Sequence, residues 1–225
     1  MQRLLTHRPE HVLLLGAHCD DVAIGSGGTL LTLCRTYPGL RVSSLVLTGG
    51  GGEREKEERA ATAAFCPEAD LNVSVLELPD GRMPGYWEHA KIALEQLSGW
   101  CQPDLILAPH PNDAHQDHRT LARLVPTVFR DHLLLGYEIL KWDGDLTQPH
   151  GYLPLSEKFI AEKAELLWEH YPSQSERSWF DQESFVGLAR VRGVQCGTRY
   201  AEAFHIPKLV LACCAEGRCG ACGYR

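Results

Sequence analysis

The sequence contains no long hydrophobic run. Apolar stretches such as residues 12–15 and 105–108 are long enough for a β-strand, and every apolar run is far too short to cross a bilayer. The N-terminal segment MQRLLTHRPE also lacks the apolar stretch of a signal peptide. We therefore expect a cytoplasmic protein that does not insert into a membrane.

Positive charge is also scarce. The chain has 22 Lys and Arg residues against 29 Asp and Glu residues, which gives a formal net charge of −7. It carries no basic run of the kind that follows a phosphate backbone. Nucleic acids and anionic membranes are therefore not expected partners.

The nine cysteines lack the even spacing of a disulfide framework. Five are scattered singly: Cys19, Cys34, Cys66, Cys101 and Cys196. We expect these five to be reduced thiols. The other four lie close together near the C-terminus: Cys213, Cys214, Cys219 and Cys222. The spacing of the last three resembles part of a plant-type [2Fe–2S] loop, but no fourth cysteine follows. An iron–sulfur cluster, a zinc-bound or disulfide-linked tail, and a plain end with free thiols all remain open for residues 207–225.

No internal repeat, low-complexity segment or Ser/Gly-rich linker divides the chain, and its 44% hydrophobic and 23% charged residues are typical of soluble globular proteins. Strand-like and helix-like segments alternate, which predicts βαβ units. We expect strands at 11–17, 41–48, 72–78, 104–109, 133–140 and 200–206, and helices at 27–37, 52–65, 87–101, 117–131, 155–171 and 178–193, with a loop at 141–152. The predicted fold is one three-layer α/β domain over residues 1–206, with a mostly parallel, Rossmann-like sheet.

His18, Asp20 and Asp21 directly follow the first predicted strand. In a doubly wound sheet, ligands bind at the carboxyl ends of the strands, where the strand order reverses. Adjacent carboxylates at such a place repel each other unless a cation neutralises part of their charge. A tight turn could bring His18 and Asp21 onto one metal ion and leave Asp20 free to act as a base.

His115, Asp117 and His118 follow the fourth predicted strand in the same way. One histidine could bind the metal while the other faces the substrate, and Asp117 could fix the tautomer of whichever imidazole it contacts. Two histidines and one aspartate with an open position are typical of a catalytic metal site. Because both clusters follow buried strands, we expect them at the same edge of the sheet.

The glycines at positions 25, 27 and 28 suggest a dinucleotide-binding loop, but the sixth position of that fingerprint is Leu30. The second predicted strand also runs into TGGGGE instead of ending in an acidic residue. We interpret these glycines as positions where a helix approaches a strand closely.

A second alternative is a non-haem iron oxygenase, in which His115, Asp117 and a distal His205 would form a facial triad. Such enzymes are built on antiparallel β-sandwiches. The alternation of strands and helices favours a hydrolase instead.

The motifs resemble those of the PIG-L/LmbE-like family of metal-dependent de-N-acetylases. The segment AHCDDVAIGSGGT at residues 17–29 is similar to the family's AHPDD and GxGGT signatures, and HQDH at 115–118 is similar to its HxDH motif. Weaker similarities are Arg54 with Glu57 and Ala61, PDG at 79–81, YPSQ at 171–174 and YAEAF at 200–204. The resemblance covers about residues 11–206.

This resemblance implies a zinc-dependent hydrolase that removes an acetyl group from an N-acetylglucosamine-type sugar or sugar conjugate, with Fe²⁺ as another possible metal. It implies His18, Asp21 and His118 as metal ligands and Asp20 as the general base. It further implies that His115, held by Asp117, stabilises the oxyanion and protonates the leaving amine. Arg54 and Asp80 lie where family members contact the sugar.

Two departures from the family pattern concern the first motif: Cys19 replaces the usual proline, and Val22 and Ala23 stand where an acidic residue usually follows the Asp pair. We expect Cys19 to be a small buried filler and the missing acidic residue to weaken support for the metal loop. An amidase acting on a non-sugar N-acyl small molecule is the alternative function, and a homo-oligomer is possible.

Overall fold

The computed structural model describes residues 8–210. It contains strands β1 (His11–Gly16), β2 (Arg41–Thr48), β3 (Asp70–Leu78), β4 (Leu105–Pro109), β5 (Leu133–Tyr137), β6 (Gly151–Leu155) and β7 (Tyr200–His205). The α-helices are α1 (Asp21–Thr36), α2 (Glu53–Phe65), α3 (Trp87–Ser98), α4 (Gln116–Val128), α5 (Glu157–His170) and α6 (Gln182–Cys196), with short 3₁₀ helices η1 (Met83–Tyr86) and η2 (Pro172–Gln174). Over this range, none of the helices combines the length and apolar content that a bilayer span requires.

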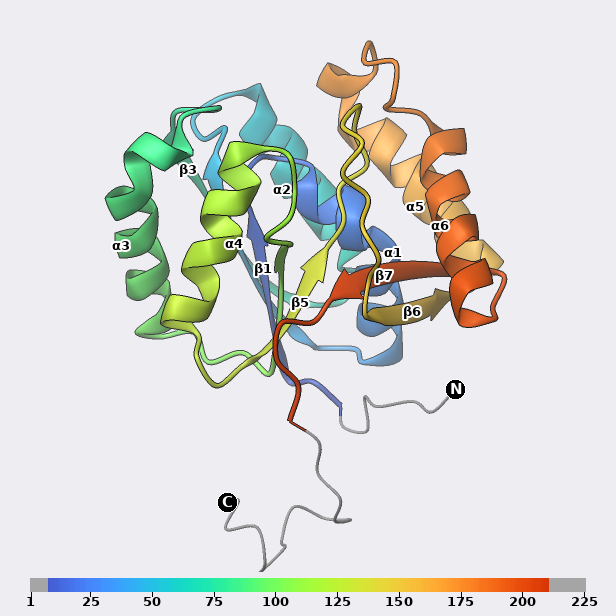
Figure 1. Ribbon diagram of the computed structural model, residues 1–225, viewed down its shortest axis with the longest axis horizontal. Helices are drawn as coiled ribbons and strands as arrows, with labels where there is room; N and C mark the ends of the chain where they lie inside the picture. Colours follow the sequence, from blue (N-terminus) through green and yellow to red (C-terminus); the bar gives the residue numbers. More distant parts are fainter. Residues whose placement is uncertain (1–7, 211–225) are drawn as a thin grey trace, which may run out of the picture.

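The strands form one sheet in the order β3-β2-β1-β4-β5-β7-β6 (Figure 1). Strands β1 to β5 are mutually parallel, and β7 runs antiparallel to both β5 and β6. The predicted α/β fold with a mostly parallel sheet is confirmed. The expected loop at 141–152 is too long, because β6 begins at Gly151 and adds an edge strand. An edge position accommodates Pro154, which has no N–H to donate.

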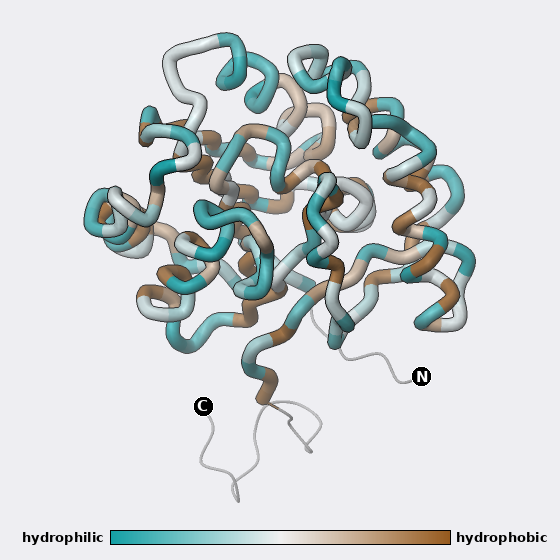
Figure 2. The backbone as a smooth tube through the Cα atoms, turned by 45° about the horizontal axis from the view of Figure 1, so that its top comes forward, coloured by the Kyte–Doolittle hydropathy of each residue, from teal (hydrophilic) through white to brown (hydrophobic). Residues whose placement is uncertain are grey.

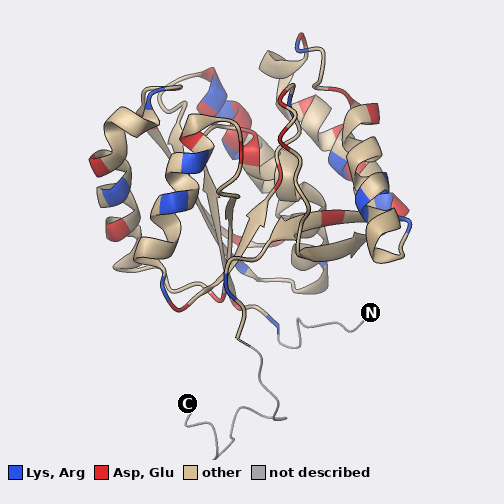
Figure 3. Ribbon diagram, in the orientation of Figure 1, with Lys and Arg blue, Asp and Glu red and all other residues tan. Residues whose placement is uncertain are grey.

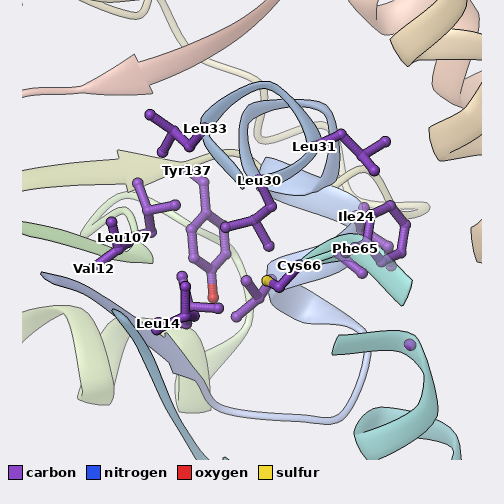
Figure 4. Close-up of a cluster of buried hydrophobic side chains, with 14 of the residues drawn as sticks. Val12, Leu14, Ile24, Leu30, Leu31, Leu33, Phe65, Cys66, Leu107 and Tyr137 are labelled. Carbon is purple, nitrogen blue, oxygen red and sulfur yellow. The ribbon is translucent and has the colours of Figure 1, made fainter. Parts of the chain in front are cut away.

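Helices cover both faces of the sheet, which makes three layers. In β1, Val12 and Leu14 face a core shared with α1, α2, α5 and α6, part of which Figure 4 shows. Leu13 and Leu15 face a second core shared with α3 and α4. Hydrophobic segments therefore run through the middle of the molecule (Figure 2), and charged residues lie mainly on the helices and loops around it (Figure 3).

Helix α1 begins at Asp21, six positions before the predicted start at Gly27, because the glycines lie within the helix. They permit close packing: a Cβ on Gly25 would lie 2.3 Å from Cδ2 of Tyr137, and one on Gly27 would lie 2.6 Å from Cε1 of Phe65. The predicted close approach of a helix to a strand is confirmed at Gly25, because Tyr137 lies in β5, but Gly27 packs against helix α2 instead. Glycine inside a helix ordinarily lowers its stability.

A buried ion pair between α5 and the last strand also bonds to the backbone of α1. The Glu202 carboxylate of β7 accepts the backbone N–H groups of Gly28 (2.8 Å) and Thr29 (2.7 Å). Lys163 of α5 lies 2.7 Å from the same carboxylate and donates to the Ile24 carbonyl oxygen at 2.6 Å. Strand β7 and helices α1 and α5 are thereby connected across the core.

The topology explains where the site forms. From β1 the chain adds β2 and β3 on one side, whereas β4 pairs with the other side of β1, so the strand order reverses between β1 and β4. The loops at 17–20 and 110–115, which carry the predicted clusters, leave the carboxyl ends of these two strands. Their meeting point is the expected position for a ligand in such a sheet.

The five cysteines within the described range are all free thiols, as predicted. Cys19 is buried, and its Sγ lies 3.5 Å from the Thr48 carbonyl oxygen and packs against Gly49, as expected of a filler. The cysteines of the C-terminal tail, Cys213, Cys214, Cys219 and Cys222, lie outside the described residues.

Candidate metal and active site

Three predicted metal ligands, from two segments far apart in the sequence, lie close together in the structure: His18 in the loop after β1, Asp21 at the start of α1 and His118 in α4. Nδ1 of His18 lies 3.0 Å from Nε2 of His118. The Asp21 carboxylate lies 3.6 Å from the first of these nitrogens through Oδ2 and 3.2 Å from the second through Oδ1. Nitrogen and oxygen ligands of a tetrahedral zinc ion lie roughly 3.3 Å apart, given bonds of about 2.0–2.2 Å. The two histidine nitrogens therefore have the spacing of ligands on one metal ion, and a different oxygen of Asp21 faces each of them.

The first turn of α1 orients Asp21 for this role. Its Oδ2 accepts the backbone N–H groups of Ala17 (2.9 Å) and His18 (2.8 Å). These bonds leave Oδ1 directed toward His118. The carboxylate is thus fixed by the loop that also carries the first histidine.

Each metal-site histidine has a carboxylate on its other ring nitrogen. Oδ1 of Asp113 lies 3.0 Å from Nδ1 of His118, while Asp117 and Asp80 lie 3.2 Å and 3.0 Å from Nε2 of His18. Metal-binding histidines commonly have such partners, which fix the ring orientation. Sequence reasoning gave Asp113 no role, although its position in the HPND segment after β4 was a usable signal.

The charge around these imidazoles also favours a cation. Burial alone would lower the pKa of His18, but Asp21 and Asp117 outweigh it and raise that pKa to about 12. Burial is similarly outweighed at His118, where Asp21 raises the pKa to about 9. Carboxylates that hold protons on the partly buried His18 and the buried His118 would hold a divalent cation in the same place. The residues therefore fit a metal ion.

Asp20 lies beside this cluster but turns to a different partner. Its Oδ2 lies 2.8 Å from Nη2 of Arg54 in α2, which also donates to the Cys19 carbonyl oxygen. Burial raises the pKa of Asp20 to about 7 against the lowering effect of Arg54, and the nearby Asp21 adds to the rise. A carboxyl group that titrates near neutrality can both accept and return a proton.

His115 faces the two metal-site histidines, with ring centroids 4.7 Å from each. The expected contact with Asp117 takes a different form: the Asp117 backbone N–H donates to Nδ1 of His115 at 3.2 Å. The Asp117 carboxylate instead accepts from Gly81 N–H and Met83 N–H and lies beside His18. His115 is therefore oriented by the first turn of α4, not by a carboxylate.

The two proposed sugar-contacting residues occupy different settings. Asp80 is at the surface, with 78% of its side chain exposed next to His18. Arg54 is bonded to protein groups: besides Asp20 and the Cys19 carbonyl, it contacts Glu57 (2.7 Å) and Ser173 (2.9 Å). In this structure the Arg54 guanidinium therefore binds protein groups, among them the Asp20 carboxylate.

The missing acidic residue of the first motif has a counterpart that the sequence did not reveal. The carboxylate of Glu58, in α2, accepts the backbone N–H of Asp20 at 2.9 Å. Val22 packs in the core instead. The metal loop therefore receives a buried carboxylate from elsewhere in the chain.

The oxygenase triad does not form. The ring of His205 stacks on His110, with centroids 4.4 Å apart, and Nε2 lies 3.2 Å from the Thr147 hydroxyl. His110 itself accepts a backbone N–H from Asn112, as expected of a residue at a strand end. Among residues 8–210, two groups could hold a metal ion, His18 with His115 and His118, and His18 with Asp80 and Asp117; neither includes His205 or the predicted ligand Asp21.

The sequence also matches a family model. Residues 13–129 match PIG-L, described as GlcNAc-PI de-N-acetylase, and this range includes both motif loops. The chain belongs to the PIG-L family. The suspected resemblance is thereby confirmed over more than half of the chain.

Solved structures share the PIG-L fold of this chain. N,N′-diacetylchitobiose deacetylase from Pyrococcus horikoshii is 21% identical, with a TM-score of 0.67 over 88% of this chain and 84% of that one. The conserved protein TT1542 from Thermus thermophilus is 24% identical, with a TM-score of 0.71 over 91% and 97%. The 4-carboxy-2-hydroxymuconate hydratase GalB from Pseudomonas putida KT2440 is 14% identical, with a TM-score of 0.68 over 90% and 98%. Since a deacetylase and a hydratase share this fold, the reaction must be argued from the site.

Proposed function

We propose that this protein is a metal-dependent N-deacetylase that removes the acetyl group from an N-acetylglucosamine-type sugar or sugar conjugate. The observation that carries the proposal is the convergence of the His18, Asp21 and His118 donor atoms within 3.0–3.6 Å, beside a carboxyl group and a third histidine that are free to act on a substrate. Membership of the PIG-L family supports this choice of reaction.

His18, Asp21 and His118 would hold the metal, and we propose Zn²⁺, with Fe²⁺ as the alternative that the same nitrogen and oxygen donors accept. When bound, the ion would polarise the acetyl carbonyl and make water more acidic. Asp113 and Asp117 would keep the two imidazoles in the orientation and tautomer that present their lone pairs to it.

We assign the proton transfers to Asp20. Its carboxylate accepts the proton that the attacking water loses, and the resulting carboxylic acid returns it to the amine nitrogen as the C–N bond breaks. The products of this step are acetic acid and the free amine: one proton of the water passes through Asp20 to the nitrogen, and the other stays on the new carboxyl group. Arg54 holds the carboxylate in place and limits the rise of its pKa.

His115 would donate a hydrogen bond to the carbonyl oxygen as negative charge develops there. Because Nδ1 accepts the Asp117 N–H, the proton of the neutral ring lies on Nε2. Burial and the neighbouring His118 lower the pKa of His115, which favours this neutral form. Protonating the amine from His115 would require a proton on Nδ1 as well, with loss of the bond from Asp117.

Asp80 is the better placed of the two proposed sugar contacts, because its exposed carboxylate can accept hydroxyl protons at the mouth of the site. Trp142, with 69% of its surface exposed, could stack on a sugar face from the loop before β6. Trp179 packs against Phe180 and the core, so its role is structural.

The test is an assay of amine release from a panel of N-acetylhexosamines, their glycoside and nucleotide conjugates, and non-sugar N-acetyl amines, with the zinc-loaded and iron-loaded protein. Asp20→Asn and His115→Ala should abolish turnover while bound metal, measured by elemental analysis, stays near the wild-type level. His118→Ala should lose both. Near-full activity of either of the first two variants would refute the assigned roles.

The same panel separates the alternative function. Preferential turnover of non-sugar N-acetyl amines would identify an amidase that uses the same residues. If an oxygen electrode shows oxygen uptake coupled to substrate turnover, the protein is an oxygenase and not a hydrolase. Failure to release any amine would overturn the deacetylase proposal.

A further inference from the structure

Asp20 has an unusual backbone conformation for a residue with a side chain. Its φ is 100°, and among residues 8–210 only one other non-glycine residue, Glu68, has a positive φ. Such a conformation is strained and persists only where the surroundings hold it. The proposed base therefore depends on contacts that fix its main chain.

One of these contacts comes from α2. The backbone N–H of Asp20 donates to Oε2 of Glu58 at 2.9 Å, and Glu58 is only 1% exposed. The same oxygen accepts the Tyr171 hydroxyl at 2.7 Å, and Thr62 lies 3.3 Å from Oε1. Glu58 is thus a buried carboxylate held from three sides.

Glu58 and Arg54 lie one helical turn apart, so both face Asp20 from the same side of α2. Arg54 holds the side-chain carboxylate of Asp20, and Glu58 holds its backbone N–H. On the other side, the Asp20 carbonyl oxygen accepts the Ile24 N–H at 2.9 Å within α1. The residue is fixed at both ends and at its side chain.

We propose that Glu58 is a positioning residue for the reaction: it holds the strained backbone of Asp20 so that the carboxylate of the base stays aimed at the substrate. This inference rests on the proposed role of Asp20. Glu58 of α2 would thus support the loop in place of the acidic residue that usually follows the Asp pair. Val22, which stands there in this chain, has no carboxylate and packs in the core.

Glu58→Met and Glu58→Gln test the proposal. Methionine keeps the length of the side chain but offers no oxygen, whereas glutamine keeps one oxygen that can accept the Asp20 N–H. Misplacement of the base by Glu58→Met should lower kcat by about 10- to 100-fold. KM should stay within about twofold of wild type and bound zinc should be unchanged, while Glu58→Gln should recover most of kcat.

Glu53→Gln is the matched control, because Glu53 is an exposed carboxylate on the same helix that pairs only with Lys56. It should leave kcat at the wild-type value. If Glu58→Met matches this control in kcat, or if it loses zinc in proportion to activity, Glu58 does not position the base.

Hydrogen–deuterium exchange of the Asp20 amide gives a readout that does not depend on activity. In the wild-type protein this amide should exchange slowly, and in Glu58→Met it should exchange at least about tenfold faster, with no change in the amides of α2. Rapid exchange in the wild-type protein would overturn the inference even if Glu58→Met did not fold. If the wild-type protein shows no deacetylation but the amide is protected as expected, the proposed function fails while the structural assignment of Glu58 stands.

Discussion

Oδ1 of Asp113 lies 3.0 Å from Nδ1 of His118, across the ring from the nitrogen that faces Asp21. The other oxygen of Asp113 lies 3.1 Å from Nζ of Lys141, so an ion pair fixes the carboxylate behind the proposed ligand. His118 therefore has a fixed carboxylate close to the ring nitrogen that faces away from Asp21.

Asp113→Ala should therefore weaken metal binding by about 10- to 100-fold, because the imidazole loses the partner that orients it. Competition with a chromophoric chelator would measure the affinity. Asp143→Asn, an exposed change in the loop that also carries Lys141, should leave the affinity unchanged. Equal affinities for the two variants would show that His118 needs no such support.

Arg54→Gln should move the acidic limb of the kcat/KM profile to higher pH. Arg54 lowers the pKa of Asp20 against the effect of burial, so its removal raises that pKa above about 7. The base must be ionised to accept a proton, and more alkaline solution is then required. The control is Arg59→Gln. Arg59 forms a surface ion pair with Glu55 on the same helix, so its replacement should leave the pH profile unchanged.

Gly25→Ala should destabilise the fold by about 1–3 kcal/mol, because the new methyl group would lie 2.3 Å from Tyr137 and 2.8 Å from the Glu138 carbonyl oxygen. Gly187→Ala provides the contrast: it lies in α6 with no atom within 4 Å of the added Cβ, and it should stabilise by up to about 1 kcal/mol. Urea unfolding of both variants measures the difference. A Gly25→Ala protein as stable as wild type would show that the contact between α1 and β5 is looser than described.

The contribution of His205 to the stability of the protein should fall as the pH drops below about 6.5. Burial and the neighbouring His110 lower the pKa of His205 to about 4. The folded state therefore resists a proton that the unfolded state accepts, and stability is lost as the pH falls from about 6.5 toward 4. His205→Gln should reduce the slope of unfolding free energy against pH in this range by up to about 1.4 kcal/mol per pH unit. If His205→Gln leaves the slope of unfolding free energy against pH unchanged, protonation of His205 does not cause the loss of stability.

The sequence motifs predicted the strand-end clusters and the parallel sheet because each depends on neighbouring residues. His18, Asp21 and His118 could be named since two buried strands each run directly into polar residues. The start of α1 was missed because glycines usually end helices, and here the demand for close packing outweighs that preference. Tertiary packing, which a local pattern does not contain, decided that boundary.

Long-range partners were the other gap. Glu58 is 38 residues from Asp20 and looks like one more charged residue in the segment EREKEER, yet it is buried. The contact of the Asp117 carboxylate with His18 joins residues 99 positions apart and was likewise not visible in the motif spacing. Strand β6 was missed because its short segment contains a proline.

The contacts of Glu202 with α1 bear on how the protein can be synthesised and shortened. The family model ends at residue 129, but the N–H groups of Gly28 and Thr29 find their acceptor only when β7 is in place. During synthesis, both motif loops leave the ribosome before Glu202 does. Until Glu202 is made, the N–H groups of Gly28 and Thr29, and then the ammonium group of Lys163, lack their buried partner. We therefore expect a fragment that ends before residue 202 to be less stable than the whole chain, because these buried groups of α1 and α5 lack their carboxylate.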